Sequence, residues 1–205
     1  DSAALYTQTS SGEEGSATGT TLTLAGQTAL ALLDIPLMRD DDDTAGFPVA
    51  MTGYLAGWPG GILYRSEDGG ASWLDVAASP YPGAVIGYTS TSLAAHGGTV
   101  YDFSGTLGVR LYMGELASVI EAQLFAGQNW FAYGVHGRWE IIAARTATLQ
   151  SDGSYILRDF LRGQRGTEWA TGLHATGDYL VLLNETSMQF VSINSSSIGV
   201  EKLYR

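Results

Sequence analysis

The sequence predicts a mainly β protein, with several short antiparallel strands in sandwich-like or barrel-like sheets and one or two short helices. Three observations predict this class. The chain has 205 residues and includes 27 glycines and 5 prolines, a density of turn-forming residues that is typical of β proteins. Short apolar runs alternate with these turns along most of the chain. Hydrophobic residues make up 45% of the sequence and charged residues 15%, so enough apolar material is present for a folded core.

The first part of the chain differs in composition from the rest. Residues 8–19 are rich in Ser, Thr, Gly and Glu and nearly without apolar side chains, which is typical of a linker. We therefore interpret residues 1–28 as a linker-like N-terminal segment. Residues 29–205 form the β-rich region, which we expect to divide into two subdomains, 29–115 and 116–205. Because the sequence does not begin with Met, we interpret it as a piece of a longer protein.

The expected strands are apolar runs bounded by turn residues. They lie at 29–33, 47–55, 61–65, 72–76, 84–88, 99–103, 107–113, 130–135, 139–148, 155–161, 179–183 and 187–193. Within 107–113, apolar residues occupy every second position, which is the period of a strand with one buried face. Asp152-Gly153 predicts a two-residue hairpin turn between runs that end at Leu149 and begin at Tyr155.

Two short helices are expected. One is predicted to begin at Ser118, because this residue and the Glu three positions later have the spacing of a capping box. Apolar residues then fall on one face until Gly127 ends the helix. A second, shorter helix is predicted to begin at Thr167, with Glu168 in its first turn, and to end by Gly172.

Charge and composition exclude several classes of function. The formal net charge is −11, from 10 Lys and Arg against 21 Asp and Glu. This balance argues against nucleic-acid binding, which needs a basic face to neutralise phosphates. No stretch reaches the ~18 to 20 consecutive apolar residues of a membrane span. The absence of cysteine excludes disulfides, thiol catalysis and Cys-ligated zinc.

The segment from Ser66 to Trp73 matches the Asp-box pattern S-x-D-x-G-x-S-W of sialidases and related β-propellers. We expect a compact turn in which Asp68 accepts hydrogen bonds from backbone amides, Gly70 adopts a left-handed conformation and Trp73 packs beneath the loop. In those families the motif is structural. A propeller would repeat it in each blade, whereas it occurs once here. We therefore interpret the motif as a structural turn without a direct role in ligand binding.

No catalytic or metal-binding residues are predicted. The four aspartates at 40–43 lack the spacing of a calcium loop and are expected to form a solvated loop. The histidines have no short metal-binding spacing and are expected on the surface or in turns: His96, His136 and His174. Any acidic protein offers carboxylate pairs for a glycosidase, here from Glu115, Glu121, Glu140, Asp159 and Glu168. The chain is therefore predicted to use no cofactor and not to be an enzyme, with a glycosidase as the least favoured alternative.

Five aromatic residues lie among glycines and prolines in the first half of the chain: Tyr54, Trp58, Tyr64, Tyr81 and Tyr88. Aromatic rings with polar tips are common where sugars stack, and they are equally common in cores and turns. Both interpretations stay open. The five residues are therefore the candidate ligand-binding set of a glycan-binding module.

The segment that runs from Arg162 through Arg165 to Glu168 allows two roles. Arginines just before a helix N-terminus are well placed to hold an anion. Alternatively, their guanidinium groups satisfy carbonyls or acids of the fold itself. We expect the second role, with at least one arginine buried and Glu168 as a partner. The segment would then lock strand 155–161 to strand 179–183.

One set of segments runs in order along the chain: 34–40, 43, 46–47, 58–61, 63–66, the Asp box, 105–111, 114–118, 127–129, 161–168, 174, 177–178 and 182–183. Together they resemble the large "megatron" tail-tip proteins of phage tails and gene-transfer-agent baseplates. The strongest segment is 161–168, and the similarity covers about residues 30–205. These proteins carry a glycosidase-like barrel in a different segment, so the resemblance implies no catalytic residues here.

The resemblance implies a structural module of a phage, prophage or gene-transfer-agent tail tip or baseplate, contributing to tail assembly and host-surface contact. The implied partners are other tail or baseplate proteins, with a homotrimer in the intact tail. The implied location is the distal tail of the virion, after synthesis in the bacterial cytoplasm. The alternative is a cell-surface, receptor-binding module that contacts a bacterial surface polysaccharide through the five aromatic residues.

Overall fold

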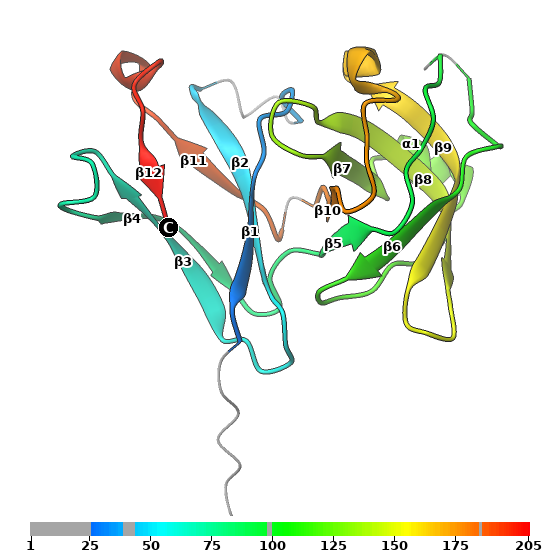
Figure 1. The fold of residues 1–205 in the computed structure, drawn as a ribbon, viewed down its shortest axis with the longest axis horizontal. Coiled ribbons are helices and arrows are strands. Elements are labelled where there is room, and N and C mark those ends of the chain that lie inside the picture. The colour runs from blue at the N-terminus through cyan, green and yellow to red at the C-terminus, as the bar shows by residue number, and fades with distance from the viewer. Residues whose placement is uncertain (1–25, 39–43, 98–99, 185) are drawn as a thin grey trace, which may run out of the picture.

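The structure is a computed structural model that describes residues 26–38, 44–97, 100–184 and 186–205. The strands form one closed barrel and two three-stranded sheets (Figure 1). The helical segments among the described residues are short: α1 (Glu121–Phe125) and the 3-10 turns η2 (Glu168–Ala170) and η3 (Ser195–Ser197). The predicted mainly β class, with antiparallel strands and short helices, is confirmed. None of these helices is long and apolar enough to cross a membrane.

The barrel consists of six antiparallel strands in the order β10-β5-β6-β9-β8-β7. Their bounds are β5 (Ile86–Thr89), β6 (Leu107–Leu111), β7 (Trp130–Gly134), β8 (Glu140–Leu149), β9 (Tyr155–Gln164) and β10 (Tyr179–Leu182). The β8–β9 hairpin closes through a hydrogen bond from Gln150 N to Ser154 O of 2.8 Å. The loop therefore has three residues and not the predicted two, because Gly153 (φ +79°) supplies a left-handed position before β9 begins.

The other two sheets lie together beside the barrel (Figure 1). One has the order β1-β2-β11, and the second has the order β12-β3-β4. Their bounds are β1 (Thr28–Leu32), β2 (Gly46–Gly53), β3 (Gly60–Ser66), β4 (Leu74–Pro80), β11 (Gln189–Ser192) and β12 (Leu203–Tyr204). Buried side chains from both sheets, and Trp58 from the loop between β2 and β3, pack against each other: Val49, Met51, Trp58, Leu63 and Val191.

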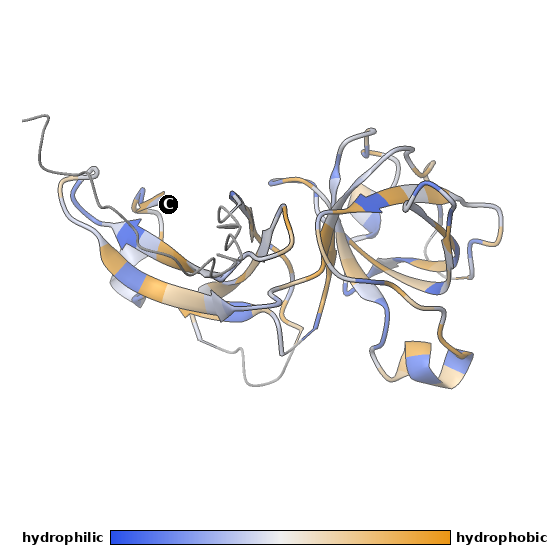
Figure 2. Cartoon of the chain, turned by 90° about the horizontal axis from the view of Figure 1, so that it is seen from below, coloured by the Kyte–Doolittle hydropathy of each residue, from blue (hydrophilic) through white to orange (hydrophobic). Residues whose placement is uncertain are grey.

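Strand alternation divides the barrel residues between two cores. On β7, Phe131 and Tyr133 belong to the cluster inside the barrel, whereas Ala132 between them belongs to a second cluster. That second cluster also contains Ala31 and Ala50 of the neighbouring sheet. The barrel and the sheet of β1, β2 and β11 therefore pack against each other through this second apolar cluster. Figure 2 shows apolar residues along the strands of both parts.

The expected division into 29–115 and 116–205 stays a prediction. In the observed topology, β5 and β6 precede residue 115 and the other four barrel strands follow it. The chain enters the barrel from the sheets and returns to them at β11. Residues 1–25 of the expected linker, and the four aspartates at 40–43, lie outside the described residues.

Two expected elements differ from the structure. Helix α1 begins at Glu121 and not at Ser118, because the Ser118 hydroxyl is engaged by β8: it accepts from Ala147 N (3.0 Å) and lies 3.2 Å from Ala147 O. In the expected strand 99–103, the described residues contribute only an isolated bridge between Asp102 and Phe160. The short helix predicted after Thr167 is present as η2.

Candidate functional site

The first candidate is a buried charge cluster at the end of the barrel where β9 leaves it. Its members are Asp102, Arg138, Glu140, Arg162, His174 and Asp178. Arg162 is 0% exposed and donates from Nε and Nη2 to the two oxygens of Glu140, at 2.7 and 2.8 Å. Its Nη1 donates to Asp102 Oδ2 (3.3 Å) and to the carbonyl of Ala94 (3.1 Å). Adjacent strands β8 and β9 are thereby joined by a bidentate ion pair.

His174 extends this cluster toward the β7–β8 turn. Its Nε2 lies 2.8 Å from Glu140 Oε2, and its ring stacks on Tyr133 with centroids 3.9 Å apart. Arg138 donates to both oxygens of Asp178, which lies 3.5 Å from His174 Nδ1. His174 was expected on the surface or in a turn. It lies in a connecting segment, but its side chain is fully buried because Glu140 and Tyr133 enclose it.

The cluster favours the ionised form of two of its carboxylates, Glu140 and Asp102. Burial by itself would raise the pKa of Glu140, but hydrogen bonds from His174 and Arg162 and the charge of Arg162 outweigh it and lower this pKa. Burial also opposes ionisation of Asp102, and hydrogen bonds from Ser104 and Gly105 lower its pKa overall. Each carboxylate is thus held by donors of the fold. The arrangement favours a structural lock over a reacting centre.

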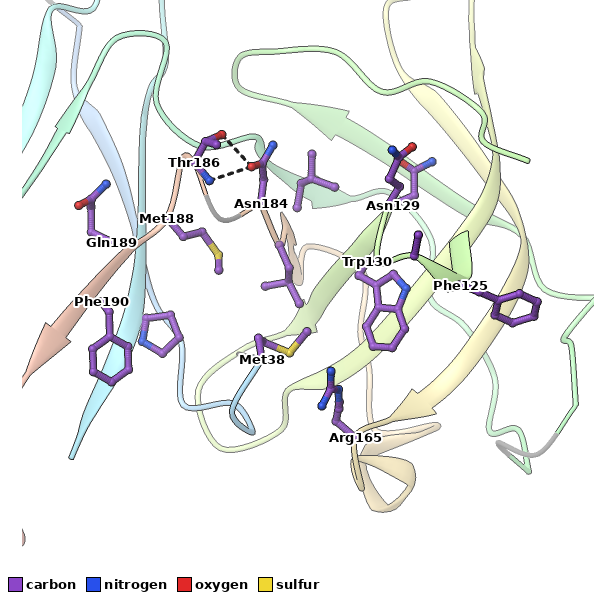
Figure 3. A pocket seen from close by; sticks show the side chains of 16 residues that line it. Met38, Phe125, Asn129, Trp130, Arg165, Asn184, Thr186, Met188, Gln189 and Phe190 are labelled. Atoms are coloured by element: carbon purple, nitrogen blue, oxygen red, sulfur yellow. Dashed lines mark hydrogen bonds between the residues drawn. The ribbon is translucent and has the colours of Figure 1, made fainter. Parts of the chain in front are cut away.

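The second candidate is a groove of about 850 Å³ where the barrel meets the sheet of β1, β2 and β11 (Figure 3). Phe125, Trp130 and Arg165 line it on the barrel side, and Met188 and Phe190 line the opposite side. The Trp130 indole N–H donates to the carbonyl of Leu124 (2.8 Å), which fixes the ring. The guanidinium carbon of Arg165 lies 5.9 Å from the centre of that ring.

The predicted corner around 162–168 is therefore only partly as expected. Arg162 is buried, but its acidic partner is Glu140 of β8 and not Glu168, whose residue is exposed. The lock joins β9 to β8 and to the segment that carries His174. Arg165 is exposed and faces the groove, because its backbone takes a left-handed turn (φ +60°) away from the barrel interior.

From the sequence, Glu140 is only one of five candidate carboxylates, and its central place in the buried charge cluster is not predicted. The signal that singles it out is its context, since one acid lies between Trp139 and two isoleucines in an expected strand. An acid at such a position is buried only if it is paired. The sequence does not say which of the eight basic residues after position 75 is the partner.

The five candidate aromatic residues do not share one surface. Trp58 is 1% exposed and donates from its indole nitrogen to Thr28 Oγ1 (2.9 Å), so its ring is in the core and is not available for stacking against a sugar. Tyr54 contacts Tyr112 with ring centroids 4.5 Å apart, and Tyr88 contacts the same ring at 5.7 Å. Tyr81 is 60% exposed in a turn, and Tyr64 lies beneath Arg205.

The Asp box forms a self-contained turn. Asp68 accepts hydrogen bonds from Ser72 N (2.9 Å) and Oγ (2.6 Å) and from Ser66 Oγ (2.8 Å). These hydrogen bonds hold the pKa of Asp68 well below its usual range. Gly70 has φ +101°, and Trp73 donates from its indole nitrogen to the Gly70 carbonyl (3.1 Å). The carboxylate is exposed, yet donors of its own turn already engage both of its oxygens.

No curated protein matches the chain. Residues 84–181 match a protein-family model described as "Rcc01698-like, C-terminal". This stretch begins two residues before β5 and ends one residue before the end of β10, so the matched region is the barrel together with its connections.

Proposed function

We propose that this chain is a structural module of a tail tip or baseplate of a phage, a prophage or a gene transfer agent. In this role it contributes to tail assembly and to contact with the host surface. Its partners are other tail or baseplate proteins, and in the intact tail it is a homotrimer at the distal end. The single observation that carries the proposal is the ordered resemblance to tail-tip proteins over about residues 30–205.

Two features support the proposal. The strongest segment of the resemblance, 161–168, contains Arg162, the centre of the buried charge cluster. The similarity therefore includes a residue that holds the barrel together. The net charge of −11 also suits a module on a particle surface, because like charge keeps particles apart in solution.

The alternative of a glycan-binding module built on the five aromatic residues is less well supported. Trp58 is in the core; Tyr54 and Tyr88 both contact the ring of Tyr112, whereas Tyr81 lies in a turn and Tyr64 on β3. We therefore do not base glycan binding on this set.

Immunogold electron microscopy tests the location. An epitope is inserted into the parent gene at the exposed hairpin loop of residues 151–153 of this chain. The fold should stay intact, since such loop tips tolerate insertions. Gold is expected at the distal tail of purified particles, with untagged particles as the control. Labelling of the head, or tagged protein that is present in cells but absent from intact particles, would overturn the proposal. Chemical crosslinking of the same particles should give a trimer of the tagged protein.

A further inference from the structure

We infer that the groove around Trp130 and Arg165 is a binding site for an anionic sugar, with Arg165 holding its carboxylate or phosphate group. The first observation is charge. The described residues that line the groove include one charged side chain, Arg165, and no acid. An anionic ligand would therefore meet one cation and no carboxylate among the described lining residues.

Arg165 differs from five of the other described arginines in what it contacts, whereas Arg205 likewise lies over aromatic rings, those of Trp73 and Tyr64. The arginines at 65, 110, 138, 145 and 162 each pair with a carboxylate. Within the described part of the chain, the guanidinium of Arg165 contacts the Trp130 ring, at 5.9 Å from its centre, and pairs with no carboxylate. A contact with a ring face does not use the N–H donors of the guanidinium, which stay available for a bidentate acceptor.

The backbone supports the same conclusion. Three non-glycine residues of the described chain have a left-handed backbone: Asn129, Asp159 and Arg165. Two of them, Asn129 and Arg165, line the groove. For arginine this conformation is unfavourable, and such strain is concentrated at functional positions. It places the Arg165 side chain in the groove.

The polar lining is preorganised for hydroxyl groups. Asn129 donates from Nδ2 to the carbonyl of Ala117 (2.7 Å), which fixes its amide and leaves Oδ1 for a ligand. Asn184 accepts at Oδ1 from Thr186 N (2.9 Å) and Oγ1 (2.8 Å), which leaves its Nδ2 donors (Figure 3). Gln128 and Gln189 add two further amides to the lining. One fixed acceptor and one fixed donor set suit hydroxyl groups, which both donate and accept.

Apolar side chains complete the match. Met188 and Phe190 lie on the side of the groove opposite Asn129 and Trp130 and offer surface to the C–H face of a sugar ring. The volume of about 850 Å³ lies within the range of about 300–1,000 Å³ for small-molecule sites. A nucleic acid would need several basic residues along its phosphates, and the described lining offers one. A ring with several hydroxyls and one anionic group fits the lining best.

Isothermal titration calorimetry with the full chain tests this site. The probes are tetragalacturonate, its methyl-esterified neutral form, and a phosphorylated mannose oligosaccharide beside unphosphorylated mannose oligosaccharide. We expect binding of one or both anionic probes and none of the neutral forms, and the two anionic probes distinguish carboxylate from phosphate. Arg165→Gln should weaken binding about tenfold or more, because it removes a bidentate charge-assisted contact.

Arg158→Gln is the matched control, since Arg158 is exposed on β9 and does not line the groove. It should bind like the parent. The inference is overturned if no anionic sugar binds, if neutral and anionic forms bind alike, or if a poly-glutamate peptide binds as well as the sugars. It is also overturned if Arg158→Gln weakens binding as much as Arg165→Gln. The melting temperature of each variant shows whether a loss of binding reflects a loss of fold.

Discussion

Arg162 and Arg165 are three residues apart and have opposite environments. Arg162 is fully buried, with Glu140, Asp102 and a carbonyl engaging its nitrogens. Arg165 is exposed beside Trp130 in the groove. The first belongs to the buried charge cluster and the second to the proposed binding site. The difference arises from the backbone, since Gly163 (φ +57°), Arg165 and the glycine after it turn the chain out of the barrel.

One polar segment can thus contribute to stability through Arg162 and, in the proposed site, to recognition through Arg165. A buried charge with complete partners costs stability only when a partner is removed, because the remaining charge is then unpaired. An exposed charge without a carboxylate partner contributes little to stability and stays available for a ligand. Substitutions in the two regions should therefore have separable effects on folding and on binding.

The largest effect is expected for Glu140→Gln. This change removes the bidentate ion partner of buried Arg162, so that Asp102 at 3.3 Å is its remaining acid, and it also weakens the contact with His174. The free energy of unfolding should fall by about 3–5 kcal/mol, as for other broken buried ion pairs. Urea denaturation followed by tryptophan fluorescence measures it. The control is Glu168→Gln, an exposed residue that should leave the midpoint unchanged. Equal midpoints for the two variants would contradict the structural role of the cluster.

Acid should weaken the same cluster without a mutation. Glu140 and Asp102 have folded-state pKa values below their ordinary values of 4.5 and 3.8. In acid the unfolded state therefore binds more protons than the folded state. The stability that these two carboxylates contribute is fully present above their ordinary pKa values, and it is lost as the pH falls through their folded-state pKa values. The free energy of unfolding should be nearly level at about pH 6–7 and should decline below about pH 4.5. Glu140→Gln should show a shallower decline, and identical slopes for variant and parent would rule out Glu140 as a source.

The Asp box extends the comparison to a site that is exposed and yet fully hydrogen-bonded. Asp68→Ala removes acceptors for Ser72 and Ser66, so the melting temperature should fall, but by less than for Glu140→Gln, because water can replace the lost partner. Asp75→Ala, at an exposed aspartate of the adjacent strand β4, is the control. Sugar binding in the groove should not change. A variant that keeps its melting temperature but loses binding would give the Asp box a ligand role.

Local patterns predicted the strands well, and long-range contacts account for what the sequence did not predict. Alternating apolar residues at 107–113 predict the strand that is present as β6, because the period of two is a local property of the sequence. Helix α1 begins three residues later than predicted, since Ser118 is held by Ala147, 29 residues away. Trp58 is a candidate sugar contact by sequence, but it is buried among residues of the two three-stranded sheets. The groove combines residues from the barrel and from β11, so no single segment of the sequence predicts it.

The smallest effect on stability, and the most informative one, is expected for Arg165→Gly. Glycine adopts φ +60° without the steric penalty that arginine carries, but it also adds entropy to the unfolded chain. The net result should be a gain of about 0.5 kcal/mol in the free energy of unfolding, with loss of anionic-sugar binding. Arg165→Gln keeps the strained backbone, so it should lose binding without the gain. If Arg165→Gly instead lowers the free energy of unfolding, the contact between the guanidinium and Trp130 stabilises the fold by more than the backbone strain costs. Arg165 would then belong, like Arg162, to the structural part of the segment.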